Sequence, residues 1–269
     1  MPEKLRILWI NPVGTDIYDD HINKILDSVK RPDVTVEVVH LPKGPKHLEY
    51  WSNISVIISD LFQTVYDAEQ KGYDAVVIGC FADPGLRGAR ELVNIPVIGP
   101  GEACMHVAST LGHKFSIIAT DKKASSILED FLYKYGLEKK LASIRVVGFT
   151  PLRMAEEPRK LQAAASREAR KAVEEDNAEV IILGCTAQSG FMKELMTELG
   201  VPVIDVVVVS FKYAEMLADL YRNTGLSHSK IYGYKSPSED ELFLRYLSKR
   251  ESSKSLSSTS GKLDYPETA

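Results

Sequence analysis

One segment of the chain is repeated about a hundred residues later, and the repeat includes glycine, cysteine and proline as well as aliphatic residues. Residues 74–86 read DAVVIGCFADPGL and residues 179–191 read EVIILGCTAQSGF. Each copy has an acid, four aliphatic residues, Gly-Cys and a glycine five places after the cysteine. Downstream, NIPVI at 94–98 is matched by GVPVI at 200–204. Two such copies predict two lobes of like fold, related by a pseudo-twofold axis.

Short aliphatic runs alternate with longer amphipathic segments. The expected strands are residues 5–11, 34–39, 74–80, 96–99, 114–120, 143–148, 178–185 and 202–206. The clearest helical segments are residues 16–30, 52–72, 85–93, 102–111, 122–136, 155–176 and 190–199. Continuously apolar strands are typical of sheets buried on both faces, and intervening helices are typical of parallel crossovers. The pattern therefore predicts a three-layered α/β fold.

The two copies also suggest how the chain is divided. We expect lobe A to comprise residues 1–100 plus 206–225, and lobe B to comprise residues 101–205. Residues 226–250 read as a C-terminal extension with a helix, since Ser238 and Glu241 have the spacing of a capping box. Residues 251–269 are rich in serine and poor in apolar residues, so we expect a disordered tail.

Composition narrows the possible partners and compartments. The 33 Lys and Arg residues nearly balance the 37 Asp and Glu residues, and the net charge of −4 argues against nucleic acid or an anionic membrane as the target. No stretch is apolar enough for a membrane span, and the N-terminus has no signal-peptide core. The three scattered cysteines fit free thiols in a reducing compartment. We therefore expect a cytoplasmic protein that acts on a small molecule.

Motifs for nucleotide, metal or serine-hydrolase chemistry are missing from the sequence. It contains no G-x-G-x-x-G after a strand, no Walker loop, no H-E-x-x-H, no C-x-x-C and no G-x-S-x-G. The six histidines show no metal-ligand spacing with the cysteines. We therefore expect neither a cofactor nor a metal.

Cys80 and Cys185 occupy the same place in each copy, at the carboxyl end of an expected strand, which is the edge where open parallel sheets bind ligands. The preceding Gly79 and Gly184 permit close backbone approach at the bend. The turns 81–85 and 186–190 offer backbone N–H groups near a helix N-terminus, and such groups can lower a thiol pKa. The alternative is that the cysteines are small buried apolar residues.

If the pseudo-twofold brings the lobes face to face, the two thiols converge on one cleft. One thiolate could then remove a proton from a substrate carbon while the other thiol returns a proton to the opposite face. The carbanion would be delocalised into an adjacent carbonyl, stabilised by N–H groups of the turns. Cys104 has no repeat partner and lies in an apolar helical segment, so core packing is the expected role.

At these residues the sequence resembles the Asp/Glu/hydantoin racemase superfamily, and within it the hydantoin and allantoin racemase branch. The resemblance covers roughly residues 5–222. It is carried by GCFADPGL at 79–86, PVIG at 96–99 with the Glu-Ala and Met-His pairs that follow, LGCT at 183–186, and Gly44-Pro45 followed by Leu48-Glu49. It implies two pseudo-symmetric Rossmann-like lobes, each a mostly parallel sheet flanked by helices, with the active site in the cleft between them.

The resemblance also implies cofactor-independent racemisation by Cys80 and Cys185 in a homo-oligomer. Asn11, at the end of the first strand, matches a family asparagine that contacts the substrate, although an Asx turn at Asn-Pro is an alternative. The turns are expected to supply the remaining substrate contacts, which are Phe81, Ala82, Asp83, Thr186 and Ala187. For Phe81, a place in the hydrophobic core is an equal alternative.

The substrate is the least constrained part of this interpretation. Residues 13–15 and the turn 186–190 depart from the branch's usual sequence. No Arg or Lys lies in either cysteine turn, which favours a neutral 5-substituted hydantoin, with allantoin as the nearest rival. Arg87 and Arg90 are expected to be solvated. Two other hypotheses are an amino-acid racemase or maleate-isomerase type of enzyme with one nucleophilic cysteine, and a non-enzymatic binding protein.

Overall fold

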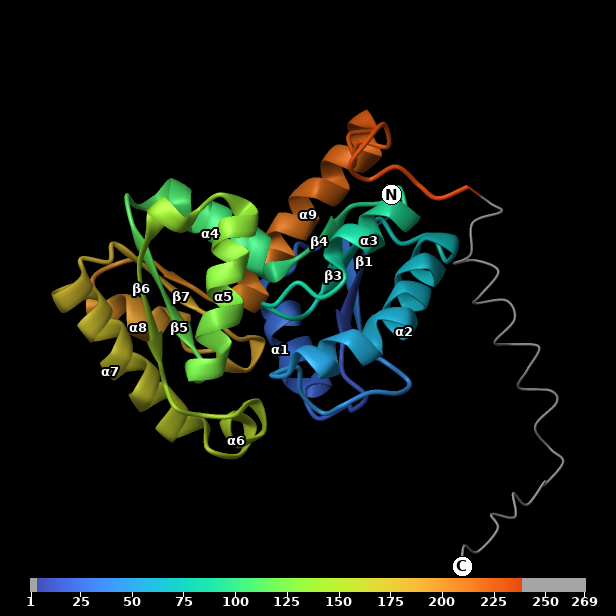
Figure 1. Cartoon of the computed structure of the whole chain (residues 1–269). Coiled ribbons are helices and arrows are strands. Elements are labelled where there is room, and N and C mark those ends of the chain that lie inside the picture. The colour runs from blue at the N-terminus through green and yellow to red at the C-terminus, as the bar shows by residue number, and fades with distance from the viewer. Residues whose placement is uncertain (1–3, 239–269) are drawn as a thin grey trace, which may run out of the picture.

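Figure 1 shows a computed structural model of the chain, which describes residues 4–238. The first half contains β1 (Leu5–Asn11), α1 (Asp19–Val29), β2 (Val34–His40), α2 (Trp51–Gln70), β3 (Ala75–Ile78), α3 (Leu86–Leu92), β4 (Val97–Ile98) and α4 (Pro100–Leu111). The second half contains β5 (Phe115–Ala119), α5 (Lys122–Tyr135), the 3-10 helix η1 (Glu138–Lys140), β6 (Leu141–Val146), α6 (Pro151–Glu156), α7 (Pro158–Asp176), β7 (Val180–Leu183), the 3-10 helix η2 (Thr186–Gln188), α8 (Met192–Leu199), β8 (Val203–Ile204) and α9 (Val206–Thr224).

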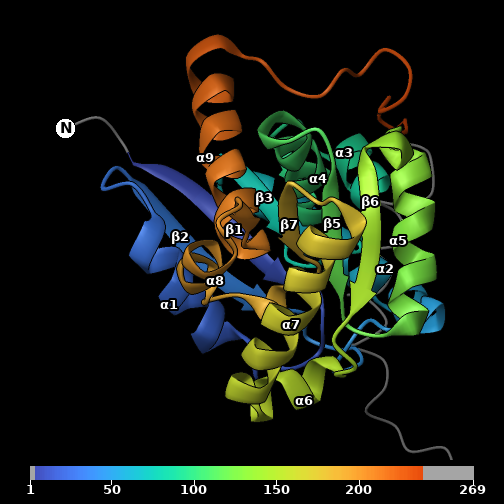
Figure 2. The same cartoon turned by 90° about the vertical axis from the view of Figure 1, so that its left-hand side faces the viewer.

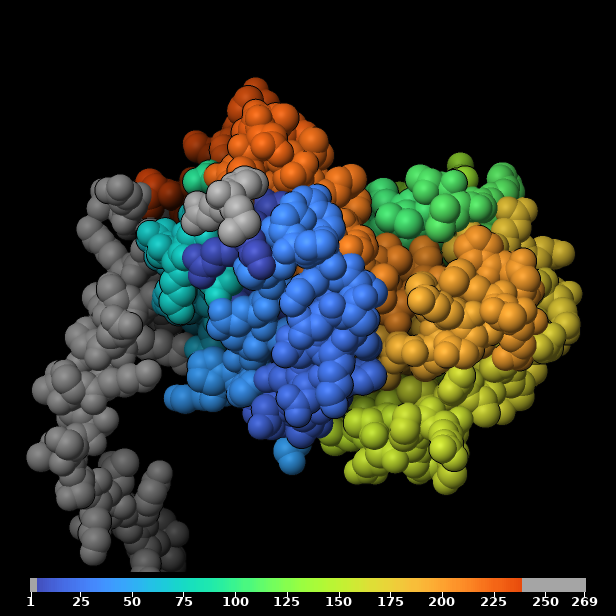
Figure 3. Space-filling view, turned by 180° about the vertical axis from the view of Figure 1, so that it is seen from behind, coloured from blue at the N-terminus to red at the C-terminus, as the bar shows by residue number. Residues whose placement is uncertain are grey.

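The strands form two four-stranded parallel sheets with the same topology. The first has the order β2-β1-β3-β4 and the second has the order β6-β5-β7-β8. Helices flank both sheets, and Figure 3 shows the two lobes side by side from behind. The α/β fold with two pseudo-symmetric lobes, predicted from the repeat and the family resemblance, is therefore confirmed.

The central strands are apolar because both faces of each sheet are covered. Every residue of β3 and of β7 is buried. In the first sheet, Ile10 and Val76 pack toward α2 and α3, whereas Trp9 and Val77 pack toward α1 and α9. This is the burial expected of an α/β sheet, in which alternate side chains enter two separate cores.

Two helical regions differ from the sequence prediction by more than their end residues. The expected helix 155–176 is two helices, α6 and α7, because Pro158 cannot donate the backbone hydrogen bond that would continue α6. Helix α9 is not among the predicted helices, since four consecutive valines at 206–209 favour a strand by local propensity. The Asp205 carboxylate begins the helix by accepting hydrogen bonds from the N–H groups of Val207 and Val208.

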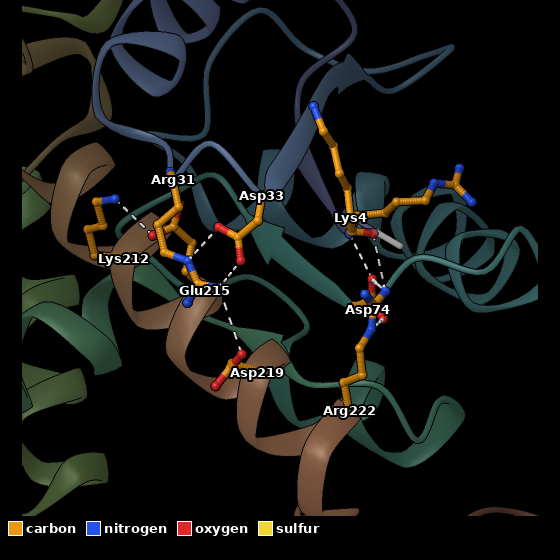
Figure 4. A network of polar contacts seen from close by, with 9 residues as sticks. Lys4, Arg31, Asp33, Asp74, Lys212, Glu215, Asp219 and Arg222 are labelled. Carbon is orange, nitrogen blue, oxygen red and sulfur yellow. Dashed lines mark hydrogen bonds and ion pairs between the residues drawn. The ribbon is translucent and has the colours of Figure 1, made fainter. Parts of the chain in front are cut away.

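Helix α9 follows the last strand of the second sheet but packs against the first sheet, beside β1 and β3 (Figure 2). Charged residues attach it there, as Figure 4 shows. The buried carboxylate of Glu215 accepts hydrogen bonds from the backbone N–H of Arg31 at 2.9 Å and from Lys212 at 2.8 Å. Farther along the helix, Arg222 donates to Asp74 at 3.0 Å. The chain therefore returns to the first lobe after the second sheet is complete.

Residues 226–238 continue past α9 without a helix or strand and lie against α3 and β4 of the first lobe. The helix expected from the Ser238 and Glu241 spacing, and the tail expected over 251–269, lie outside the described residues. None of the helices in residues 4–238 is long and apolar enough to cross a membrane.

Candidate active site

The two cysteine turns have the same backbone geometry in both lobes. Cys80 follows β3 and Cys185 follows β7. The N–H of residue 83 donates to the Cys80 carbonyl at 3.0 Å, and the N–H of residue 188 donates to the Cys185 carbonyl at 2.9 Å. Both cysteines are partly exposed, whereas Cys104 is fully buried in the second-lobe core, as predicted. The repeat therefore places a cysteine side chain at the equivalent sheet edge of each lobe.

The glycine before each cysteine is required by close packing at the strand end. A Cβ atom on Gly79 would lie 2.7 Å from Cε2 of Trp9, and a Cβ atom on Gly184 would lie 2.7 Å from Cγ2 of Ile117. Separations under 3.0 Å force the neighbours apart. The expected close backbone approach is thus seen in both lobes.

Both cysteines open onto one cavity of about 120 Å³ between the lobes. A cavity needs roughly 10–15 Å³ of such volume to hold one water molecule, so this one has room for a small organic molecule. The sequence-predicted residues that line it are Asn11, Cys80, Phe81, Ala82, Cys185, Thr186 and Ala187. The pseudo-twofold therefore brings the two turns to a shared space, as the repeat suggested.

Asn11 is held in a defined orientation at the cavity wall. Its side-chain oxygen accepts a hydrogen bond from the Trp9 indole at 2.8 Å, and its amide donates to Asp19 at 2.6 Å. The Asx turn considered from the sequence is not the contact found, because the N–H of Val13 donates to the backbone carbonyl of Asn11 instead. Asn11 is buried and its partners fix it, which suits a substrate contact.

Asp83, also expected to contact the substrate, does not line the cavity. Its buried carboxylate accepts hydrogen bonds from the N–H groups of Gly101 and Glu102, at 2.8 and 2.7 Å, and from the Tyr135 hydroxyl at 2.6 Å. The carboxylate therefore caps the N-terminus of α4 and holds the Cys80 turn against it. Helix N-termini favour such an anion, which explains why the side chain points inward.

The second lobe has an equivalent link between its cysteine turn and α9, but the carboxylate belongs to the helix start instead of the turn. In the repeat alignment, Val207 and Val208 correspond to Gly101 and Glu102, and Asp205 corresponds to Gly99. The carboxylate of Asp205 accepts from the N–H groups of both valines and from the N–H of Gly190 in the Cys185 turn at 2.8 Å. A carboxylate thus links the cysteine turn to a later helix in both lobes. In the first lobe it belongs to Asp83 of the turn, and in the second lobe it belongs to Asp205 at the start of the helix.

Burial of Asp83 predicts a specific pH dependence of stability. Desolvation raises its pKa from the usual 3.8 to about 6, despite hydrogen bonds that act to lower it. Between these values the folded chain binds more protons than the unfolded chain, so stability falls as pH rises from about 4 to about 6, by up to about 3 kcal/mol. Urea unfolding of the protein and of Asp83→Asn across this range measures it. The unfolding free energy of the protein minus that of Asp83→Asn is expected to fall as pH rises from about 4 to about 6. A difference that stays constant over this pH range would contradict the prediction.

The cysteine pKa values differ from the sequence expectation. The backbone N–H groups of Ala82 and Ala187 do act to lower the thiol pKa values, as expected of these turns. Burial outweighs them, and it raises the pKa of Cys80 to about 12 and that of Cys185 to about 11. At each cysteine, desolvation disfavours the thiolate more than the single oriented N–H group favours it. Each thiolate, once formed, is therefore a strong base.

Three ionisable cavity residues were not identified as candidates from the sequence. Glu49 and His47, on the segment between β2 and α2, lie 3.1 Å apart, and Tyr18 precedes α1. Burial raises the pKa of Glu49, and burial together with the charges of Cys185 and Glu49 raises the pKa of Tyr18. The resemblance at Leu48-Glu49 was the only sequence signal pointing to this segment.

The cavity lining is otherwise uncharged. Its other lining residues are apolar or small, and neither Lys nor Arg is among those described. Within residues 4–238, no three His, Cys, Asp or Glu side chains are grouped so as to hold a metal ion. The arrangement suits acid–base chemistry by two thiols on an uncharged substrate.

Known proteins with similar sequences and structures identify the family to which the chain belongs. The family Asp/Glu/Hydantoin racemase matches residues 7–214. A hydantoin racemase of Pseudomonas sp. (strain NS671) is 35% identical over 237 residues, which is 88% of this chain and 94% of that protein.

Two solved structures resemble the fold closely. Allantoin racemase from Klebsiella pneumoniae has a TM-score of 0.83 and 30% identity, covering 89% of this chain and 96% of that one. Allantoin racemase from Pseudomonas fluorescens has a TM-score of 0.82 and 31% identity, covering 88% and 99%. The chain thus belongs to the Asp/Glu/hydantoin racemase family and is an isomerase of the racemase class.

Proposed function

We propose that the protein racemises 5-substituted hydantoins at C5, without a cofactor, by proton transfer between Cys80 and Cys185. The observation that carries the proposal is that two structurally equivalent cysteine turns, one from each lobe, open onto a single small cavity. A base and an acid on opposite faces of one carbon are what stereoinversion by proton transfer needs. The hydantoin racemase relative supports this substrate class.

In the proposed reaction, the thiolate of one cysteine removes the C5 proton, and the electron pair moves into the adjacent carbonyl to give an enolate. The thiol of the other cysteine then donates its proton to the opposite face of C5, which restores the carbonyl and leaves a thiolate on that side. The product is the other enantiomer, and the reverse reaction uses the cysteines in exchanged roles. Backbone N–H groups of the turns would stabilise the enolate oxygen.

The absence of cationic Lys or Arg side chains from the described lining supports a neutral ring as the substrate. An α-amino acid carries a carboxylate that binds most strongly to a cationic side chain, and the described cavity residues include neither Lys nor Arg. A hydantoin instead presents N–H donors, for which the carboxylate of Glu49 and the side-chain oxygen of Thr120 are acceptors in the cavity wall. Allantoin is a hydantoin with a polar ureido group, and the two solved allantoin racemases make it the second candidate.

The proposal is tested in D2O with enantiopure 5-benzylhydantoin, 5-isobutylhydantoin and allantoin. Loss of optical rotation with deuterium incorporation at C5, faster than in a blank without enzyme, is the expected result. The relative rates rank the substrates. Absence of acceleration on all three would refute the proposed substrate class. Light scattering on the same preparation tests the homo-oligomer that the family resemblance implies.

A maleate-isomerase type of reaction differs because one cysteine would bond covalently to the substrate. Intact-mass measurement after rapid acid quenching during turnover distinguishes the two. We expect an unmodified mass with a hydantoin, since simple proton transfer forms no adduct. A mass increase equal to the substrate would contradict the two-base scheme.

The raised thiol pKa values predict the pH profile. Because both values lie well above neutrality, the thiolate fraction grows about tenfold per pH unit, and kcat/KM is expected to rise nearly as steeply from pH 6.5 to 8.5. Initial rates corrected for the blank measure this. A flat profile over the same range would mean that a thiolate is already formed at neutral pH.

We expect Glu49→Gln to weaken substrate binding more than turnover. Loss of a charged acceptor for a substrate N–H removes roughly 1.5–3 kcal/mol, so KM should rise about tenfold or more while kcat changes little. The matched control is Glu129→Gln, an exposed residue of α5 that lies outside the cavity lining. Equal KM values for the two variants would show that Glu49 does not contact the substrate.

A further inference from the structure

A second cavity of about 210 Å³ lies between α3, α4 and α5, beside residues 226–238. It is lined by Leu86, Arg87, Arg90, Glu102, His106, Lys134, Tyr135 and Tyr234. These residues come from both lobes, and none of them lines the active-site cavity. Tyr234 lies beyond residues 7–214, the part that matches the racemase family.

The sequence prediction that Arg90 is solvated is wrong, although Arg87 is exposed as expected. Arg90 is 6% exposed and donates hydrogen bonds to the Val97 carbonyl at 3.0 Å and the Tyr234 hydroxyl at 3.2 Å, and it pairs with Glu102. It is buried because residues 226–238 cover the end of α3. The cavity therefore has a fixed, charged side chain in its wall.

Residues 226–238 form a fixed part of that wall. The Lys230 ammonium donates to the carbonyls of Arg90, Glu91 and Val93, which end α3, at 2.5, 3.1 and 2.8 Å. His228 accepts from the N–H of Val97 at 2.9 Å, and burial lowers its pKa to about 4, so it stays neutral and able to accept. These contacts hold Tyr234 against Arg90.

The cavity carries an excess of positive charge. Arg90 is neutralised by Glu102, but no carboxylate of residues 4–238 pairs with Arg87 or Lys134. Lys134 lies over the rings of Phe131 and Tyr135, at 5.3 and 5.0 Å. Burial, together with the charges of Arg87 and Arg90, lowers the Lys134 pKa, although Asp83 and Glu102 act against this. Two unneutralised cations beside a buried guanidinium and aromatic walls suit an organic anion.

The same cavity is joined to the Cys80 turn by two hydrogen bonds. The Tyr135 hydroxyl donates to the Asp83 carboxylate at 2.6 Å, and the Asp83 N–H donates to the Cys80 carbonyl at 3.0 Å. Asp83 also has a positive φ of 44°, a backbone conformation that is uncommon for a non-glycine residue. A ligand that moves Tyr135 therefore alters the support of Cys80.

We propose that this second cavity binds a small organic anion with a carboxylate or phosphate group, through Arg87, Lys134 and Arg90, and that its occupancy changes the reactivity of Cys80. The effect on racemisation rests on the proposed function, whereas binding of the anion does not. One fitting carboxylate is the N-carbamoyl amino acid formed when a hydantoin ring is hydrolysed. A phosphate monoester presents the same charge.

Isothermal titration of the full chain with N-carbamoylglycine and, separately, with inorganic phosphate tests the site and distinguishes the two anion sources. We expect saturable binding of at least one, weakened about tenfold by Lys134→Gln and by Arg87→Gln. The control is Lys139→Gln, which removes the same charge from an exposed position outside the cavity. Binding of neither anion, or equal affinities for Lys134→Gln and Lys139→Gln, would overturn the proposal.

Coupling to Cys80 is measured by the rate at which iodoacetamide alkylates it, followed by peptide mass spectrometry. A saturating anion is expected to change this rate at Cys80 at least twofold, and Tyr135→Phe should abolish the change while the anion still binds. An unchanged alkylation rate at saturation would refute the coupling. Because neither readout uses turnover, a failure of the hydantoin assay alone would leave the anion site intact.

Discussion

Replacing either Cys80 or Cys185 with serine is expected to lower kcat/KM for racemisation by about 10²- to 10⁴-fold, the scale of a lost acid–base group. A serine hydroxyl is nearly isosteric with the thiol but far less acidic, so it neither forms the base nor donates the proton effectively. Both cysteines are partly exposed at the cavity, and the substitution should leave the fold unchanged. Optical rotation with each pure enantiomer measures the loss.

The single variants should differ in which enantiomer they still deprotonate. Each retains one base on one face of C5, so deuterium from D2O is expected to enter one enantiomer without inversion, and the other enantiomer should exchange in the complementary variant. Cys104→Ser is the matched control, because Cys104 is buried away from the cavity. This variant should unfold more readily but should still racemise both enantiomers. Complete racemisation by either single variant would falsify the two-base scheme.

Gly79→Ala is expected to have the second largest effect, on both activity and stability. Its methyl group would overlap the Trp9 indole, which also holds the cavity residue Asn11 through the 2.8 Å hydrogen bond. Relief of the overlap displaces Cys80, Asn11 or both. A displacement of about 1 Å can cost about a hundredfold in rate, and overpacking of this kind costs about 1–3 kcal/mol of folding free energy.

Activity per folded molecule and thermal unfolding of this variant measure the two effects separately. Gly233→Ala is the control, since its added Cβ would meet no heavy atom within 4 Å. We expect that control to retain activity and melting temperature. If Gly79→Ala behaved in the same way, the close packing of strand end and indole would not be what positions the site.

Much of the fold could be predicted because the strands are specified locally. The apolar runs that become β3 and β7 have no polar face to present to solvent, so they fit only a sheet covered on both sides. Helix α9 was missed because its first turn is four valines, whose local preference is overridden by the Asp205 cap and by packing on the first sheet.

The cavity could be predicted only where its residues adjoin the repeat. Phe81, Ala82, Thr186 and Ala187 follow the cysteines directly, so their place at the sheet edges follows from the strand ends. Glu49 reaches the same cavity from a segment without a periodic pattern, and Tyr18 reaches it from the start of the expected helix 16–30. Asp83 turns away from the cavity to cap α4. Arg90 is buried by residues more than a hundred positions later in the chain.

The sequence alone determined that this protein has two like lobes with a cysteine at the same strand end in each, because aliphatic runs, glycines and cysteines repeat in register. Only the tertiary structure decided which groups surround those cysteines and how they ionise. Burial between the lobes raises both thiol pKa values although the turn N–H groups oppose this. The physical reason is that strand formation depends on neighbouring residues, whereas desolvation depends on atoms that only folding brings together.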